Sequence, residues 1–371
     1  MSDAATKYAP GTHPDMPPPR GTTGPVYWIR ENLLSSPANI IMTILTVWFL
    51  YKIIPGMVEW FFTDASFTGA DRNECRAKGD GACWAFIGER LKLFTYGFYP
   101  AENRWRVNLS FVLLIFAALP ILWDRIPFRK YGLIFSAVFP FIAGWLLIGG
   151  FGLELVDTEK FGGFMLTLVI GVTGIAISLP IGVLLALGRQ SRLPIIRYSC
   201  VAFIEFIRGV PLITLLFVAS TMLSYFLPPG TSFDLLLRVL IMVTLFASAY
   251  MAEVIRGGLQ ALPKGQTEAA DAMGLKYWPS MRLIVLPQAL KISIPGIVNT
   301  FIGLYKDTTL VIVIGLLDPL GIGRASLADT KWQGLSNEVY IFVAIFFFIS
   351  CFAMARYSLY LEDKLQTGHK R

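Results

Sequence analysis

The sequence is dominated by long runs of apolar residues, each about as long as a bilayer is thick. An α-helix rises 1.5 Å per residue, so about 20 apolar residues cross a hydrocarbon core of about 30 Å. Charged residues make up only 15% of the chain, whereas soluble domains carry about 25%. We therefore expect an all-α, polytopic membrane protein with about eight transmembrane helices, at residues 38–62, 107–124, 131–151, 162–188, 200–227, 235–255, 292–317 and 339–360.

The loops between these runs differ in charge in a regular way. Arginine and lysine gather in 124–130, 189–198 and 256–291, while 152–160 is acidic and 228–234 carries a single charge. Cytoplasmic loops of membrane proteins are enriched in Lys and Arg, which predicts that the basic loops and both termini lie in the cytoplasm. The formal net charge of +7 is spread over these loops rather than gathered in one patch, which argues against nucleic-acid binding.

Histidine and proline usage narrow the function further. The only histidines, His13 and His369, lie close to the two termini, so we expect no metal site and no catalytic residue within the membrane. Residues 1–37 contain a cluster of prolines, and we expect them to form a disordered cytoplasmic tail. This segment lacks the basic-then-apolar order of a cleaved signal peptide.

The four cysteines fall into two pairs. Cys75 and Cys83 lie in the predicted outer loop 63–106. In an oxidising exterior they could form a disulfide, and the alternative is two unpaired surface cysteines. Cys200 and Cys351 lie in or beside apolar runs and are expected to be buried thiols.

The chain is expected to divide near residue 157. Residues 38–157 form a three-helix extension with the periplasmic loop 63–106, and 158–371 form a core of five helices with one elaborate cytoplasmic loop, 262–287. Within the core, Gly171, Gly174 and Gly182, with Pro180, predict close helix packing in the fourth span.

The loop 262–287 contains a short helix that can be predicted from its residues. Pro263 and Gly265 end the preceding span, and Thr267 is a suitable N-cap. The acids Glu268 and Asp271 follow in the first turn, where the helix dipole favours them. Gly274 stands where a left-handed residue ends a helix. Because so short and polar a helix is unstable alone, it should rest on another surface.

The spacing of this loop resembles the EAA loop of bacterial ABC-importer permeases. In that family the short helix is a coupling helix that docks on a cytosolic ATPase, and the resemblance implies an ABC permease core of type I. The runs 162–168, 205–211, 249–258, 286–290 and 306–310 are similar to the polar amino acid permease group (histidine, glutamate, glutamine, arginine and opine importers). The residues carrying the coupling match are Glu268, Ala269, Ala270, Asp271, Gly274, Ile284, Leu286 and Pro287.

The resemblance covers roughly 162–360 and implies a complete assembly. The chain would be the permease subunit of an ATP-driven amino-acid importer in the bacterial inner membrane. Its partners would be a sister permease, a cytosolic ATPase pair and a periplasmic amino-acid-binding protein. No G-x-x-x-x-G-K-[ST] motif occurs, so ATP and Mg²⁺ would be held by the ATPase and this chain would need no cofactor. The three added front helices resemble the larger permease of general L-amino-acid importers.

Charged residues within the spans are candidates for the substrate path, because an ionisable group inside a bilayer is costly unless it is paired or hydrated. Glu205 and Arg208 share one helix face in the fifth span, just before Pro211, which should kink the helix. They either line the path or form an internal ion pair. Glu253 and Arg256 lie near the cytoplasmic end of the sixth span, where snorkelling explains them without substrate.

The seventh span contributes Asn299, Lys306 and Asp307 as further candidates. Two arrangements are open. The helix could break at Gly303–Lys306, with Asp307 capping a second half-helix whose positive end meets a carboxylate. Alternatively, the charges could pair between helices without touching substrate.

Two other classes of protein remain to be compared with the importer. An ion-coupled secondary amino-acid transporter could use the same buried charges but would need no ATPase. A membrane-embedded enzyme would need a catalytic constellation, which the two terminal histidines do not supply.

Overall fold

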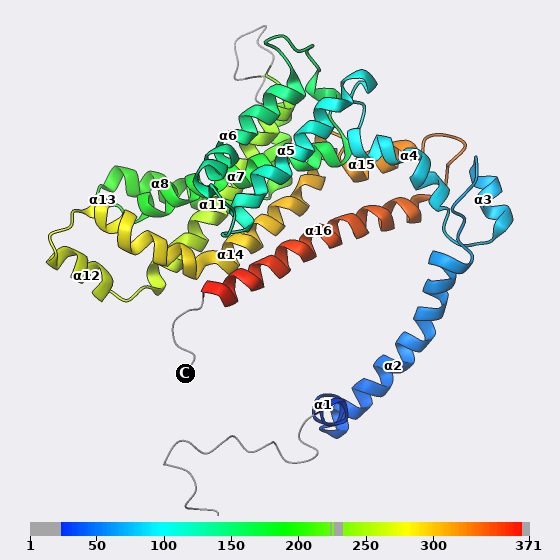
Figure 1. Cartoon of the computed structure of the whole chain (residues 1–371), viewed down its shortest axis with the longest axis horizontal. Helices are drawn as coiled ribbons and strands as arrows, with labels where there is room; N and C mark the ends of the chain where they lie inside the picture. Colours follow the sequence, from blue (N-terminus) through cyan, green and yellow to red (C-terminus); the bar gives the residue numbers. More distant parts are fainter. Residues whose placement is uncertain (1–23, 223–224, 226–232, 366–371) are drawn as a thin grey trace, which may run out of the picture. The chain divides into compact units, whose positions relative to one another are not determined.

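The computed structural model describes residues 24–222, 225 and 233–365, and these residues form helices joined by short loops (Figure 1). They contain no β-sheet, only two isolated β-bridges. Seven of the described helices are long and apolar enough to cross a membrane, and a bent pair brings the number to eight. The all-α, polytopic prediction is therefore confirmed. The chain forms two compact units, residues 1–66 with 75–82 and residues 67–74 with 83–371.

The first unit contains α1 (Pro25–Leu33) and α2 (Pro37–Val58), which ends in a π-helical turn at Glu59–Thr63. The Ser36 hydroxyl caps α2 by accepting a 3.2 Å hydrogen bond from the backbone N–H of Asn39. The predicted disordered tail 1–37 is wrong for its last part, because Pro25 starts a regular helix there. Residues 1–23 lie outside the described residues.

The second unit contains the remaining spans, close to their predicted positions. The proline-containing helices continue through Pro120, Pro140 and Pro180 without a break. The membrane helices are α5 (Arg104–Leu122), α6 (Arg129–Ile148), α7 (Gly163–Arg189), the pair α8 (Pro194–Gly209) and α9 (Leu212–Thr221), α11 (Leu235–Ala261), α14 (Leu286–Asp307) and α16 (Ser336–Leu365). Shorter elements of this unit are α4 (Trp84–Tyr96), α12 (Gly265–Ala272), α13 (Tyr277–Ser280), α15 (Pro319–Ser326), and the turns Ala101–Asn103, Thr158–Lys160, Met281–Val285 and Thr308–Ile314. The boundary between the two units falls within α3 (Arg72–Lys78).

Glycines allow α7 to pack closely on its neighbours, as the sequence predicts. A Cβ atom added at Gly182 would lie 2.6 Å from Cγ of Met251 in α11. One added at Gly174 would lie 3.0 Å from a methyl group of Leu304 in α14. Contacts this short leave no room for a side chain, so these glycines set the distance between the helices.

The fifth span differs from its prediction in an important respect. One kinked helix at 200–227 was expected, but α8 and α9 are separate helices that meet at 99°. Val210 between them is extended, with φ −114° and ψ 131°. A residue before proline avoids the helical region, and Pro211 has no N–H to continue the ladder. The proline therefore ends the helix rather than bending it.

An ion pair and a hydrogen bond join the α5–α6 hairpin to α16 within the second unit. The Asp124 carboxylate between α5 and α6 forms ion pairs with Arg129 and with Lys364 of α16. The hydrogen bond from Lys364 lowers the pKa of Asp124. In addition, the Tyr357 hydroxyl donates to the carbonyl of Leu122 at 2.9 Å. These two helices thus belong to one compact unit with the later spans, whereas the sequence groups them with the first helix.

Two of the four cysteines are disulfide-bonded and two are free thiols. Cys75 and Cys83 are disulfide-bonded, which corresponds to the bridged alternative. Cys200 and Cys351 are free thiols, but both are half-buried rather than fully buried.

A buried carboxylate caps α15 outside the membrane spans. Asp318 is fully buried and accepts hydrogen bonds from the backbone N–H groups of Gly321, at 2.9 Å, and Leu320, at 3.2 Å. Burial raises the pKa of this carboxyl from 3.8 to about 6. The folded state therefore holds the proton more tightly than the unfolded state does.

We expect acid to stabilise this cap. Between pH 3.8 and about 6 stability should rise as pH falls, and above pH 6 the folded state bears the full cost of the buried charge, about 3 kcal/mol. Asp318→Asn keeps a good N-cap without charge. Thermal unfolding of the purified protein in detergent should show the variant more stable than wild type at pH 8 and the difference shrinking at pH 5. An equal difference at both pH values would contradict this account.

Candidate functional site

The short helix predicted in the loop 262–287 is α12, but it begins earlier than expected. It starts at Gly265, and its N-cap is Lys264, which has helical angles and makes no side-chain cap. The prediction of Thr267 as N-cap is therefore wrong. Turn bonds from Gln266 and Thr267 to the carbonyls of Pro263 and Lys264 already wind the chain before Glu268.

The end of α12 is as the sequence predicts. Gly274 has φ +76°, in the left-handed region. Its N–H bonds to the carbonyl of Asp271 at 2.9 Å, and the N–H of Leu275 bonds to that of Ala270 at 3.1 Å. This pair of bonds is a Schellman motif, which requires a left-handed residue at the position of Gly274.

One side of α12 contacts the protein and the other sides are free. Ala270 is its only fully buried residue. The Gln288 amide, near the start of α14, donates to the side chain of Gln266 at 3.2 Å and to the carbonyl of Ile284 at 2.9 Å. α12 is thus hydrogen-bonded to a membrane helix. Of the other predicted coupling residues, Ile284 and Leu286 are half-buried, and Glu268, Ala269, Asp271, Gly274 and Pro287 are exposed.

Three large apolar side chains of the loop that contains α12 are exposed. Met273 is 68% exposed, Trp278 65% and Leu283 68%. Exposed apolar groups of this size in a polar loop indicate a protein interface. Sequence reasoning missed them, although the adjacent aromatic pair Tyr277–Trp278 in a basic loop was a usable signal.

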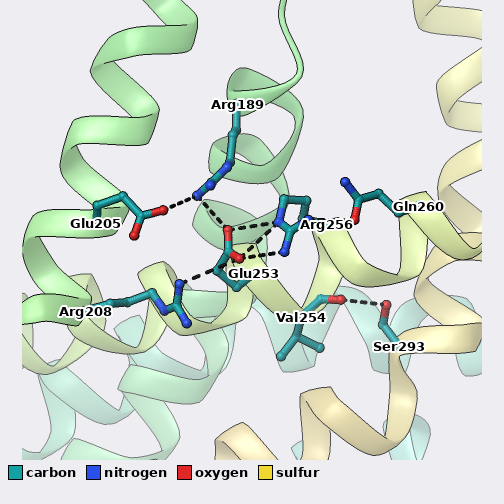
Figure 2. A network of polar contacts seen from close by, with 8 residues as sticks. All are labelled: Arg189, Glu205, Arg208, Glu253, Val254, Arg256, Gln260 and Ser293. Atoms are coloured by element: carbon teal, nitrogen blue, oxygen red, sulfur yellow. Dashed lines mark hydrogen bonds and ion pairs between the residues drawn. The ribbon is translucent and has the colours of Figure 1, made fainter.

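A second polar site lies where α7, α8 and α11 meet (Figure 2). Glu253 of α11 is at its centre, and the side chains of Arg189, Arg208 and Arg256 point toward it. The nitrogen–oxygen distances are 2.8 Å to Arg189, 2.9 Å to Arg256 and 3.6 Å to Arg208. The Glu253 side chain is only 15% exposed, so it is a largely buried anion held by three cations.

The remaining members extend this cluster outward. Glu205 of α8 pairs with Arg189 at 2.9 Å, and its side chain is 55% exposed. Arg256 also donates to Gln260 at 2.6 Å. The guanidinium of Arg208 lies 5.5 Å from the ring centre of Tyr250, a cation–π distance.

These contacts correct two expectations. Glu205 and Arg208 do not pair with each other; each binds a residue of another helix. Glu253 does not snorkel toward water but is the common partner of the arginines. Sequence reasoning missed Arg189 in the site, because it ends α7 in a basic loop and nothing local connects it to a residue 64 positions away.

The seventh span has neither arrangement proposed for it. α14 runs without interruption through Gly303, and only at Thr308 does it tighten into a 3₁₀ turn. Asp307 precedes that turn but makes no side-chain cap. In the part of the chain that the structure describes, the side chains of Lys306 and Asp307 have no hydrogen-bond or ion-pair partner. Asn299 and Lys306 are exposed and Asp307 is half-buried.

Comparison with known proteins identifies the family. A family model described as "Binding-protein-dependent transport system inner membrane component" matches residues 178–367. The chain is 48% identical over 359 residues to the inner membrane amino-acid ABC transporter permease protein YhdY of Escherichia coli (strain K12), covering 96% of this chain and 97% of that protein. It is 46% identical over 427 residues to the glutamate/glutamine/aspartate/asparagine transport system permease protein BztC of Rhodobacter capsulatus, covering 95% and 96%.

A shorter relative matches only part of the chain. The probable glutamine ABC transporter permease protein GlnM of Bacillus subtilis (strain 168) is 34% identical over 209 residues, which are 56% of this chain and 93% of the relative.

The chain therefore belongs to the family of inner membrane components of binding-protein-dependent transport systems. It is a membrane-spanning permease subunit of an ABC importer rather than an enzyme. An importer of this kind works with an ATPase and a substrate-binding protein, so family membership disfavours the ion-coupled alternative.

Proposed function

We propose that the chain forms half of the translocation path of an ATP-driven amino-acid importer and receives the ATPase movement through α12. The observation that carries this proposal is the exposed α12, which the Gln266–Gln288 hydrogen bond joins to the start of α14. Met273, Trp278 and Leu283 are exposed in the same loop. The amino-acid substrate is supported by the names of the two relatives that match nearly the whole chain.

The connection between α12 and α14 is short. The turn at residues 273–276 separates α12 from α13, and from Tyr277 onward α13, the π-helical turn Met281–Val285 and α14 follow one another without a loop. A displacement of α12 therefore acts on α14 directly. The coupling residues are Glu268, Ala269, Ala270, Asp271, Gly274, Ile284, Leu286 and Pro287.

The same helix carries the candidate contacts for the substrate. Asn299, Gly303 and Lys306 recur at intervals of four and three residues, so they share one face of α14. A Cβ atom added at Gly303 would meet nothing within 4 Å. We propose that this open polar face, with Asp307 beside it, meets the charged ends of an amino acid in the path. Glu205 and Arg208 then serve the path indirectly, by holding α8 through the Glu253 cluster.

The proposed assembly has four kinds of component. A sister permease completes the path, a cytosolic ATPase pair holds ATP and Mg²⁺, and a periplasmic binding protein delivers the amino acid. Both termini of this chain lie in the cytoplasm, in keeping with its basic loops. As ATP closes the ATPase pair, α12 moves and the path opens outward.

Reconstitution tests this function. The chain is purified with its sister permease and ATPase into proteoliposomes, and the binding protein is added outside. We expect uptake of a labelled amino acid only with ATP inside, and competition among unlabelled acidic, basic and neutral amino acids should define the substrate. Uptake that persists without ATP and follows a proton or sodium gradient would contradict the proposal.

A further inference from the structure

We propose that α1 is an interfacial helix that lies along the membrane surface, with Val26, Ile29 and Leu33 inserted among the acyl chains at the cytoplasmic face. Its partner is the lipid of the membrane that α2 crosses. The cytoplasmic side follows from the orientation proposed above, whereas the position at an interface does not depend on it.

The side chains of α1 are arranged for such a boundary. Val26, Ile29 and Leu33 recur at intervals of three and four residues and so form one apolar face. Glu31 lies on the opposite side. Tyr27 and Trp28 flank Glu31, about 40° and about 60° around the helix from it. Residues with an apolar body and a polar tip concentrate at the headgroup level of membranes.

The described residues of its compact unit leave most of the surface of this helix exposed. Val26 is 80% exposed, Trp28 58% and Ile29 43%, and α1 contains no buried residue. A helix of nine residues is too short to be stable in water by itself. An apolar surface that covers Val26 and Ile29 would supply the missing stabilisation.

Hydrogen bonds fix the direction of α1 against α2. The Thr43 hydroxyl donates to the carbonyl of Leu33 at 2.9 Å, and the Asn39 amide donates to the Ser35 hydroxyl at 2.7 Å. Figure 1 shows α1 nearly along its axis at the start of α2, which is seen from the side. The two axes therefore cross steeply. Since α2 crosses the bilayer, α1 runs along the surface.

The same bonds set the depth of α1. Thr43 follows Pro37, the first residue of α2, by six positions, which correspond to about 9 Å along the helix axis. The end of α1 thus lies beside the second turn of α2. Interfacial helices insert their apolar faces by about 5–10 Å, which agrees with this depth.

The charge of α1 indicates whether its insertion depends on anionic lipid. Arg30 and Glu31 cancel each other, so electrostatic attraction to anionic headgroups is weak. Insertion should depend on the apolar face and the aromatic residues. We therefore expect the same accessibility pattern in bilayers with and without anionic lipid.

Spin-label accessibility tests the proposal in the full complex. Cys200→Ser and Cys351→Ala remove the free thiols while Cys75 and Cys83 remain disulfide-bonded, and single cysteines are then introduced at residues 26–33 and labelled. The ratio of oxygen to nickel-chelate accessibility should oscillate with the helical period, several-fold higher at 26, 29 and 33 than at 31. Residue 45 of α2 and residue 192 of the α7–α8 turn serve as lipid and water standards.

A matched pair of substitutions shows whether a new charge disturbs insertion only when it lies on the apolar face. Ile29→Lys should lower the ratio at residue 33 several-fold, while Glu31→Lys should leave it unchanged. High nickel-chelate accessibility at all eight positions would overturn the proposal in favour of a helix in water. Low accessibility to both reagents would overturn it in favour of a protein partner. Neither result would affect ATP-driven uptake, so the test stands apart from that of the proposed function.

Discussion

Tryptophan in place of Gly274 is expected to abolish ATP-driven uptake while the permease still inserts and folds. A Cβ atom added at this position would meet nothing within 4 Å in the isolated subunit, so a side chain there starts into open space. Gly274 lies beside the exposed residues of α12, and a large side chain there would hold the ATPase away from that surface. Uptake measured in proteoliposomes should fall at least tenfold, which corresponds to about 1.4 kcal/mol of lost coupling energy.

Two smaller substitutions distinguish size from backbone strain. Gly274 has φ +76°, so any other residue weakens the helix end, though asparagine tolerates this region best. Gly274→Asn should keep most uptake, and Gly274→Ala should lose an intermediate amount. If alanine and tryptophan were equally damaging, the backbone conformation rather than contact with the ATPase would be responsible. Full uptake in Gly274→Trp would contradict the coupling role.

Loss of Glu253 is expected to destabilise the permease more than loss of any other single charge in its cluster. Glu253→Gln removes the carboxylate that Arg208 and Arg256 share, while Arg189 keeps its ion pair with the more exposed Glu205. Removing one partner of a buried ion pair costs about 3–5 kcal/mol, and the arginines here are 24–34% exposed, so we expect about 3 kcal/mol. The midpoint of thermal unfolding in detergent should fall markedly.

Glu205 provides the matched control for this prediction. Glu205→Gln removes the same charge from the same network, but Glu205 is 55% exposed and pairs with a single cation, Arg189, among the described residues. Exposed pairs contribute about 0–1 kcal/mol, so its effect should be small. Removing a cation together with the anion, in Glu253→Gln with Arg189→Gln, should recover part of the loss. Equal effects of Glu205→Gln and Glu253→Gln would show that Glu253 is not the centre of the cluster.

The features that could be predicted from the sequence are those with local causes. Apolar length located the spans, because any helix in a bilayer must satisfy its backbone internally and therefore run on until it leaves the hydrocarbon. Gly274 was recognised because a left-handed helix end depends on one residue. The glycines Gly174 and Gly182 were recognised because a missing side chain is the condition for close packing.

The errors arose where local rules compete. Pro211 was expected to bend a helix, but the helix ends before it because Val210 is extended and Pro211 has no N–H to donate. Thr267 was expected to cap α12, but turn bonds beginning at Pro263 started the helix earlier. Pro25 was placed in a disordered tail because of the neighbouring prolines, although proline is well suited to the first turn of a helix.

For this protein the sequence alone determined the membrane class, the approximate spans and the short helix of the loop 262–287. Only the tertiary structure decided which charges meet. Glu253 binds Arg189 and Arg208 from two other helices, and no periodicity within one helix contains that information. Side chains distant in sequence become partners through the angles and distances at which helices pack, and these depend on the shapes of both surfaces together.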